Sequence, residues 1–327
     1  MLLRTLKSNQ TFHFLLIPLI AIALWVKSFM NPALFPFFAG EDMMLLYQPI
    51  NALIGKSIII SDIFALLFII LLAFLILKLN VQYTFIRVRT VLPSILFILI
   101  TSGLHELHAM HPVYPAALFL ILTVDRIFNA YDKEVIHSNA FEAGIFLAIG
   151  SLFYLNLVFF FPFLWIGFII LKPKVNWREF ILTTLGFIFP WLAALAYFGA
   201  PGQTDELMIT LKANLSLHQS FLRQNLPIQI YMGFLVFLTL LASVLLLSQY
   251  DGKKISSRKY FKAFFWIFLI SCILIAANPA VSQEIIIQLA IPLTYLISNY
   301  MIYMKRQIWG EIFLYILTAG VIYLQFV

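Results

Sequence analysis

Apolar runs of about 15 to 22 residues recur along the whole chain, and a run of this length crosses the hydrocarbon core of a bilayer as an α-helix. No other feature of the sequence restricts the fold as much. Of the 327 residues, 63% are hydrophobic and only 11% are charged, and the mean hydropathy is +0.99. In a soluble domain about a quarter of the residues are charged, and such a domain cannot bury this much apolar surface in one core. The sequence therefore predicts an all-α, polytopic transmembrane helical bundle.

We predict about eleven spans that form a single integral membrane domain over residues 1–327. The first span follows a short basic start and has no small-residue cleavage site after it, so we expect it to be retained. The apolar block 141–171 is too long for one crossing, and we expect it to turn at Asn156 and Pro162. The predicted spans are 12–30, 59–78, 90–104, 112–125, 141–155, 157–171, 179–198, 228–248, 262–277, 284–302 and 310–326.

Lysine and arginine are distributed unevenly between the two sides that these spans define. With the N-terminus in the cytoplasm, 17 of the 21 basic residues fall at inner positions, five of them in the basic loop 249–262. The outer loops hold only Lys56, Lys212 and Arg223, and the remaining basic residue, Lys27, lies near the outer end of the first span. This bias follows the positive-inside rule and predicts a cytoplasmic N-terminus and an outer C-terminus. Because topology accounts for the net charge of +7, we expect membrane lipid, and no nucleic acid, as a partner.

The polar residues of the predicted outer side gather in three segments, which are the first outer loop 31–58, the segment 103–112 and the outer loop 199–227. In the first loop, Glu41 and Asp42 precede a stretch that suits a short amphipathic helix at the membrane surface. Acidic residues at a helix start are stabilised by the helix dipole alone. In the alternative interpretation they are catalytic: one carboxylate is the general base for a hydroxyl nucleophile, and the other holds a sugar hydroxyl or a metal ion.

The segment 103–112 reads GLHELHAMHP and holds three of the six histidines of the chain. His105, His108 and His111 are spaced so that a helical turn places them on one side, and with Glu106 they have the chemistry of a zinc or other divalent metal site. The spacing is not that of the HExxH motif. A second interpretation is a polar turn between two short spans. A third is substrate binding or proton transfer, because histidine titrates near neutral pH.

The third outer loop begins with a Gly/Pro turn, after which Asp205 and Glu206 stand where the first turn of a helix is expected. Apolar residues then recur at helical spacing, which predicts an amphipathic helix in the outer interface. Such a helix needs no function beyond contact with the membrane surface. In the functional interpretation, these two acids and the scarce outer cations Lys56, Lys212 and Arg223 bind substrate, and the cations hold a lipid phosphate.

With these parts in this order, the chain resembles the GT-C class of polytopic glycosyltransferases over residues 1–200. Enzymes of that class have an acidic residue or pair in the first outer loop beside a surface helix, where this chain has Glu41 and Asp42. The glycine-spaced, aromatic stretch 142–168 is also similar to theirs, although this chain is shorter and lacks a large C-terminal soluble domain. Its composition, rich in Phe, Ile and Leu with Asn and Lys in the loops, also resembles that of polytopic inner-membrane proteins of Bacteroidota. This resemblance implies the inner membrane of a bacterium.

The GT-C resemblance implies transfer of a sugar from a polyprenyl-phosphate carrier to an acceptor hydroxyl at the outer face of the inner membrane. Asp42 or Glu41 would deprotonate the acceptor. The departing lipid phosphate would be stabilised by Lys212, by Arg223 or by a cation bound to the three histidines. No cofactor other than such a divalent metal ion is implied.

Two alternative functions remain open. One is a non-catalytic integral membrane subunit or scaffold of a cell-envelope complex, for secretion, motility or glycan assembly, with other envelope membrane proteins as partners. The other is a transporter, although transporters place ionisable sites near the bilayer midplane and these spans carry almost no central charge. Asp62, near an outer span end, is expected to be paired or to extend to the interface.

Overall fold

The computed structural model describes residues 13–32, 37, 40–55, 57–172, 174–199, 204–215, 226–277 and 283–326, apart from the side chains of Glu106, Thr204 and Glu206. Within these ranges every regular element is a helix, so the predicted all-α bundle is confirmed. The elements are α2 (His13–Met30), α3 (Gln48–Ile54), α4 (Ile58–Tyr83), α5 (Leu92–Ser102), the short 3-10 helix η1 (His105–His108), α6 (Val113–Asn129), α7 (His137–Phe153), the 3-10 helix η2 (Leu155–Phe160), α8 (Phe161–Leu171), α9 (Trp177–Gly199), α10 (Thr204–Asn214), α11 (Leu226–Ser248), α12 (Ile255–Ala277), α13 (Ile285–Tyr303) and α14 (Gln307–Leu324).

Each range predicted to span the membrane contains a helix, namely α2, α4 to α9 and α11 to α14. In the described part of the chain, seven helices are long and apolar enough to cross a bilayer, and these are α2, α4, α9, α11, α12, α13 and α14. The helix α5 and the stretch Leu155–Leu171 are apolar but shorter. The chain is therefore a helical membrane protein, and the number of eleven crossings stays a prediction.

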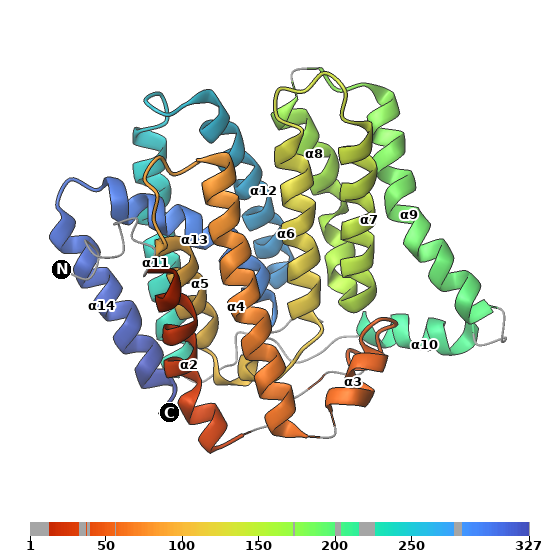
Figure 1. Cartoon of the computed structure of the whole chain (residues 1–327), viewed down its shortest axis with the longest axis horizontal. Helices are drawn as coiled ribbons and strands as arrows, with labels where there is room; N and C mark the ends of the chain where they lie inside the picture. Colours follow the sequence, from red (N-terminus) through yellow and green to blue (C-terminus); the bar gives the residue numbers. More distant parts are fainter. Residues whose placement is uncertain are drawn as a thin grey trace.

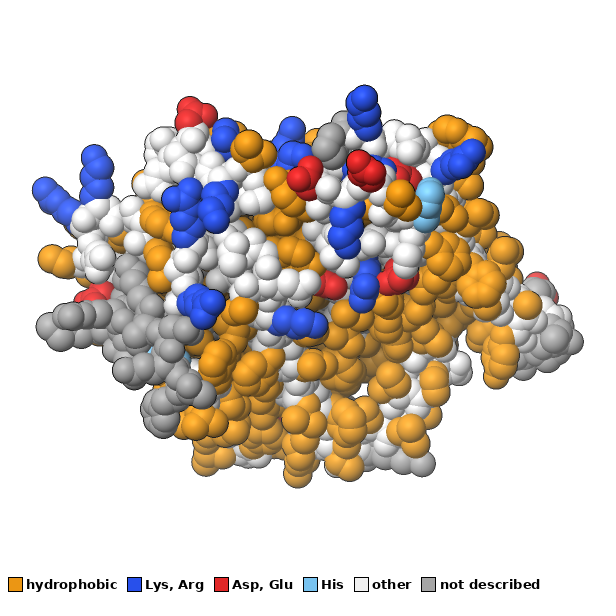
Figure 2. All heavy atoms as spheres, turned by 45° about the horizontal axis from the view of Figure 1, so that its top comes forward, with side chains coloured by type: hydrophobic (Ala, Val, Ile, Leu, Met, Phe, Trp, Pro, Cys, Tyr) orange, Lys and Arg blue, Asp and Glu red, His pale blue; other side chains and the backbone are white. Residues whose placement is uncertain are grey.

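The helices lie side by side, and their direction alternates along the chain (Figure 1). One end of the bundle, at the top of Figure 1, carries the connections that follow α4, α6, α8 and α11. Lysine and arginine side chains gather at this end, beside a band of hydrophobic side chains (Figure 2). The opposite end carries α3, η1 and α10, which belong to the three segments predicted to be outer. We call the two ends the basic end and the outer end; the positive-inside rule predicts that the basic end faces the cytoplasm.

The apolar block 141–171 turns where its length and proline predict. The helix α7 ends at Phe153, and Tyr154 has an extended backbone with φ −136° and ψ 107°. The 3-10 helix η2, which contains Asn156, follows, and α8 then begins with Pro162 in its first turn. Proline suits that place because its missing N–H has no helical partner there. The predicted turn at Asn156 and Pro162 is confirmed.

The helices α7 and α9 approach each other backbone to backbone. A Cβ atom on Gly144 of α7 would lie 2.3 Å from the carbonyl oxygen of Thr183, and one on Gly186 of α9 would lie 2.2 Å from the carbonyl oxygen of Phe141. No side chain fits at such distances, so glycine is required on both helices. Close approach through small residues is a common way for helices to associate in a membrane, where the surrounding lipid removes most of the hydrophobic driving force.

The helix α13 lies in the middle of the bundle. It packs against α5, α6, α11, α12 and α14, and the Tyr295 hydroxyl donates to the carbonyl oxygen of Ile76 in α4 at 2.8 Å. Of the most apolar 18-residue stretch of α13, 83% of the residues are buried, whereas only 11% are buried in the corresponding stretch of α9. The helix α9 therefore faces the surroundings along most of its length, and α13 forms the centre of the core.

Candidate functional site

The acidic loop at residues 40–47 is fixed to α10. Gly40 has a φ of +90°, which favours glycine, and its carbonyl oxygen accepts a hydrogen bond of 2.8 Å from Nδ2 of Asn214. A Cβ on Gly40 would lie 2.7 Å from that same nitrogen. Both the backbone conformation and the close approach of α10 therefore need glycine immediately before the two carboxylates.

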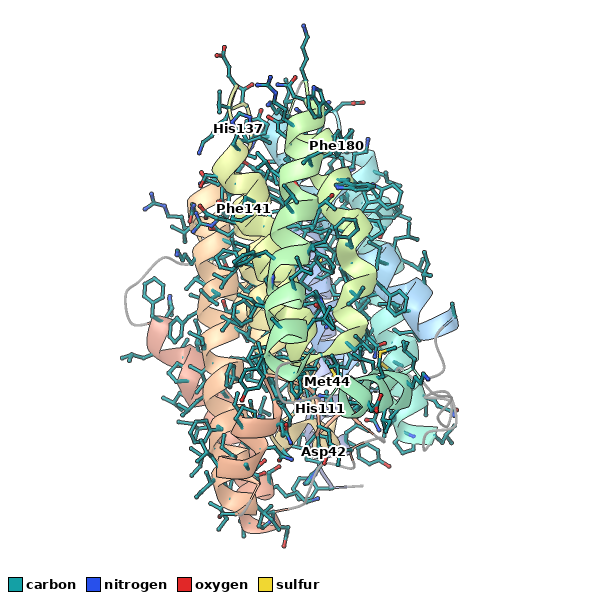
Figure 3. All side chains as sticks on the ribbon, turned by 90° about the vertical axis from the view of Figure 1, so that its right-hand side faces the viewer. Asp42, Met44, His111, His137, Phe141 and Phe180 are labelled. Carbon is teal, nitrogen blue, oxygen red and sulfur yellow. The ribbon has the colours of Figure 1, made fainter. Side chains whose placement is uncertain are left out.

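The same loop also contacts the histidine segment and the end of α7. The Tyr47 hydroxyl donates to the carbonyl oxygen of Met110 at 2.9 Å, and the N–H of Leu46 donates to the carbonyl oxygen of Leu152 at 3.3 Å. Figure 3 shows Asp42, Met44 and His111 close together at the outer end, far from His137 at the basic end. All three segments predicted to be outer thus converge at one place.

Glu41 and His111 form a buried pair at this place. Their exposed fractions are 3% and 0%, and Nε2 of His111 lies 3.3 Å from Oε2 of Glu41. The N–H of Val113 donates to Nδ1 of His111 at 3.1 Å, so Nδ1 carries no proton and Nε2–H donates to the carboxylate. The ring of Phe37 stacks on the imidazole, with 5.5 Å between ring centroids. The histidine therefore fixes the Glu41 carboxylate in place.

Tyr154 and Glu284 extend this pair into a larger polar cluster. The Tyr154 hydroxyl donates to Oε1 of Glu284 at 2.8 Å, and the Tyr154 ring lies edge-on to His111 at 6.1 Å. Tyr154 is therefore a hydrogen-bond donor to this carboxylate. We call these four residues, Glu41, His111, Tyr154 and Glu284, the outer polar cluster.

Two further buried polar side chains point to the same end of the bundle. Asp62 is only 1% exposed, and neither of its carboxylate oxygens has a hydrogen-bond partner among the described groups. The preceding Ser61 accepts a hydrogen bond from the N–H of Met110, which places Asp62 beside the histidine segment. Gln288, one turn after Glu284, is fully buried, and its amide also lacks a partner within the described residues. The expectation that Asp62 is paired or reaches the interface is wrong.

The three histidines do not form one ligand set. His105 and His108 stack in η1 with 5.4 Å between their rings, as residues three apart do in a 3-10 helix. The chain becomes extended at Ala109, with φ −95° and ψ 155°, and His111 then reaches Glu41 instead. In the part of the chain that the structure describes, no group of three or more His, Cys, Asp or Glu side chains is placed to hold a metal ion. In the predicted metal site, His111 is thus separated from His105 and His108. The side chain of Glu106 is not among those that the structure describes.

His108 is instead a structural residue of the contact between η1 and α2. Its Nδ1 accepts from the hydroxyl of Ser28, its Nε2 lies 3.3 Å from the carbonyl oxygen of Ser102, and its ring stacks on Trp25 at 4.2 Å. Burial, together with the charge of neighbouring His105, lowers the pKa of His108 to about 3. The ring is therefore neutral in the folded protein.

This burial predicts a specific acid sensitivity. The unfolded chain protonates His108 below about pH 6.5, while the folded protein does so only near pH 3. Stability is therefore present above pH 6.5 and decreases as the pH falls from 6.5 towards 3. We expect His108→Asn to flatten the decrease in the thermal midpoint of the detergent-solubilised protein between pH 7.5 and pH 4.5. His137→Asn, which removes an exposed ring, is the control and should leave the slope of the wild type; an equally steep slope in His108→Asn would contradict the assignment.

The predicted substrate-binding residues are only partly described. Lys212 and Asp205 lie on α10, and both side chains are exposed. Lys56 and Arg223 lie outside the described residues, as does the side chain of Glu206. The helix α10 itself lies across the outer end of the bundle, which agrees with the predicted interfacial helix (Figure 1).

Two cavities have α10 as a wall, and the acidic loop lines the first of them. The first, of about 320 Å³, lies between Met43 of the loop, Gln48 of α3, Phe198 of α9 and Thr210 of α10. The second is an apolar groove of about 410 Å³, lined by aliphatic and aromatic side chains of η2, α9 and α10. Its α9 side chains include Leu192, which is 56% exposed, so the groove is open at the lipid-facing side of the bundle.

Comparison with known proteins assigns a family. The model of the Family of unknown function (DUF6427) matches residues 43–327. The chain belongs to this family. The DUF6427 match begins directly after Asp42 and includes the histidine segment, α10 and Glu284. No curated protein and no solved structure matches this DUF6427 chain.

Sequence reasoning singled out Glu41 and His111 but missed their partners in the outer polar cluster. Tyr154 lies within an apolar block, and one tyrosine among many aromatic residues gives no signal. Glu284 and Gln288 give a weak one, because two polar residues four positions apart at the start of an apolar span share one helix face. That face is buried in this DUF6427 protein.

Proposed function

We propose that the protein is a membrane glycosyltransferase that transfers a sugar from a polyprenyl-phosphate carrier to an acceptor hydroxyl at the outer face of a bacterial inner membrane. The observation that carries the proposal is the convergence of the acidic loop, the histidine segment and α10 beside an apolar groove. A transfer of this kind needs base, sugar and lipid phosphate within reach of one another, and holding them together supplies much of the rate.

The two carboxylates of the loop have different surroundings, which favours different roles. Glu41 is buried and fixed by His111, so we assign it to positioning the loop. Asp42 is half-buried and has no hydrogen-bond partner among the described residues. We therefore assign the general base to Asp42. It accepts the proton of the acceptor hydroxyl, the hydroxyl oxygen bonds to the anomeric carbon, and the bond from that carbon to the phosphate oxygen breaks with its electrons on the phosphate.

The apolar groove suits the polyprenyl chain. Its walls are aliphatic and aromatic, it opens towards lipid, and Leu211 of α10 and Leu215, directly after α10, form part of it. Lys212 lies between these two leucines in the sequence and its side chain is exposed. We assign to Lys212 the binding of the lipid phosphate and the stabilisation of the charge that develops on it as the sugar leaves.

The test is Asp42→Asn in membranes that contain the full chain. The substrate is a panel of polyprenyl-phosphate monosaccharides, offered with envelope glycan fractions as acceptors, and the measurement is release of polyprenyl phosphate. We expect the wild type to release it from at least one donor, and Asp42→Asn to be slower by about 10²-fold or more, because a general base contributes 10² to 10⁴.

Glu134→Gln is the control, since it removes an exposed carboxylate at the basic end, far from the proposed site, and should keep wild-type activity. Full activity in an inserted, folded Asp42→Asn protein would overturn the role of Asp42. A wild type that releases nothing from any donor, yet co-purifies with other envelope membrane proteins in mild detergent, would overturn the enzyme and identify a non-catalytic subunit.

A further inference from the structure

A third cavity lies at the basic end, at the opposite end of the bundle from the outer polar cluster. It has a volume of about 400 Å³ and lies between the segment after α4, the connection from α11 to α12 and the end of α13. Its lining includes Phe85, Arg87, Lys253, Ser257 and Tyr303. The proposed sugar transfer uses none of them.

The cavity has two cations and no neutralising carboxylate. Nη2 of Arg87 donates to the carbonyl oxygen of Gly252 at 3.2 Å, and Nζ of Lys253 donates to Oδ1 of Asn299 at 2.7 Å. Neither cation is paired with an acidic side chain in the described part of the chain. The acid in the same connection, Asp251, is fully exposed and lies 3.9 Å from an arginine outside the cavity lining, Arg258.

Lys253 is a partly buried cation that aromatic faces stabilise but that no carboxylate neutralises among the described residues. Its Nζ lies over the rings of Tyr303 and Phe261, at 4.7 Å and 5.4 Å from their centroids. Burial and the nearby charge of Arg87 lower the pKa of Lys253 to about 8. At neutral pH the lysine is still mostly protonated, so two positive charges face one small, partly desolvated space.

Ser257 adds an independent sign of a ligand. It lies in the first turn of α12, a helix of 23 residues, and is only 2% exposed. The residue lines the cavity, and its hydroxyl has no hydrogen-bond partner among the described groups, although buried hydroxyls are nearly always bonded. The first N–H groups of a helix also lack intrahelical partners and favour a negative charge.

We propose that this cavity binds a phosphate group through Arg87, Lys253, the Ser257 hydroxyl and the N-terminus of α12. A tetrahedral anion suits this set, because it accepts hydrogen bonds from several directions at once and two cations neutralise it. The phosphate belongs either to an anionic phospholipid of the cytoplasmic leaflet, which basic pockets between membrane helices bind, or to a soluble phosphate compound. Both share the chemistry that the side chains recognise.

The experiment measures binding to the purified full chain in two arms. In the lipid arm, the protein is placed in nanodiscs of phosphatidylcholine with or without phosphatidylglycerol, and the thermal midpoint and retained lipid are measured. In the soluble arm, inorganic phosphate is titrated into protein in neutral detergent. The variants are Lys253→Gln, Arg87→Gln and Ser257→Ala. The control is Lys254→Gln, which removes an exposed charge from the adjacent position outside the cavity lining.

We expect binding in at least one arm, with the arm identifying the source of the phosphate. Loss of one charged hydrogen bond should weaken it about tenfold or more in Lys253→Gln and Arg87→Gln, and less in Ser257→Ala. Lys254→Gln should bind as the wild type does. Ser257→Ala removes one atom and should keep the unliganded thermal midpoint, so its weaker binding cannot come from unfolding. No binding in either arm, or equal losses in Lys254→Gln and Lys253→Gln, would overturn the proposal.

Discussion

Replacement of Gly186 by alanine is expected to destabilise the protein by about 2 kcal/mol or more, because inserting a methyl group into a filled contact typically costs 1 to 3 kcal/mol. The added Cβ would lie 2.2 Å from the carbonyl oxygen of Phe141, so α7 and α9 would have to separate. Backbone atoms cannot rotate away as the end of a flexible side chain can. The measurement is the thermal midpoint of the detergent-solubilised protein, followed by tryptophan fluorescence.

Gly233→Ala is the control, and its expected effect on stability is opposite to that of Gly186→Ala. Gly233 lies inside α11, and beyond its own helix backbone no heavy atom of the described residues lies within 4 Å of the position that its Cβ would take. Alanine is a better helix former than glycine by about 1 kcal/mol, so this variant should be neutral or more stable. Equal midpoints for Gly186→Ala and Gly233→Ala would show that α7 and α9 do not depend on the close approach.

The second large effect is expected at a buried ion pair between the end of α8 and the start of α9. Nζ of Lys172 contacts Oε1 of Glu179, and the two residues are 5% and 1% exposed. Oε2 of Glu179 also accepts from the N–H of Asn176 at 2.9 Å. Glu179→Gln leaves the lysine buried beside a neutral amide, and removing one partner of a buried pair costs about 3 to 5 kcal/mol. The thermal midpoint should fall steeply.

An exposed pair at the same end of the bundle is the matched comparison. Nη1 of Arg126 lies 3.1 Å from Oε2 of Glu142, but about a third of each side chain is exposed. Exposed pairs contribute about 0 to 1 kcal/mol, so Glu142→Gln should change the midpoint little. The double variant Lys172→Met with Glu179→Leu removes both charges and should recover part of the loss. A similar effect of Glu142→Gln and Glu179→Gln would contradict the role given to burial.

The helices were predictable because a membrane leaves few choices. A chain segment in hydrocarbon must satisfy its own backbone hydrogen bonds, so each long apolar run becomes a helix. The turn at Asn156 and Pro162 was predictable for a related reason, since the block around it exceeds one bilayer crossing and contains a helix-starting proline. The segregation of basic residues also follows from the sequence, because charge on short loops decides which end faces the cytoplasm.

The partners within the candidate site were not predictable. Glu41 and His111 are 70 positions apart, and Tyr154 and Glu284 are 130 apart, so helix packing decides which of them meet. The histidine spacing suggested one ligand set because it assumed an α-helical turn. The segment instead forms a short 3-10 helix followed by an extended residue. For the same reason the burial of Asp62 could not be read from its place near a span end.

The central position of α13 has a consequence for how the protein is assembled. Its buried face carries Gln288, Ser298 and Asn299, which are costly to expose to hydrocarbon. It is also the second-to-last of the described helices, and its neighbours α4, α5, α11 and α12 all precede it in the chain. A ribosome therefore delivers α13 only after the helices that cover its polar side chains have been synthesised. Insertion of this helix is expected to depend on partners that are already in the membrane, and the order of the helices in the gene provides them.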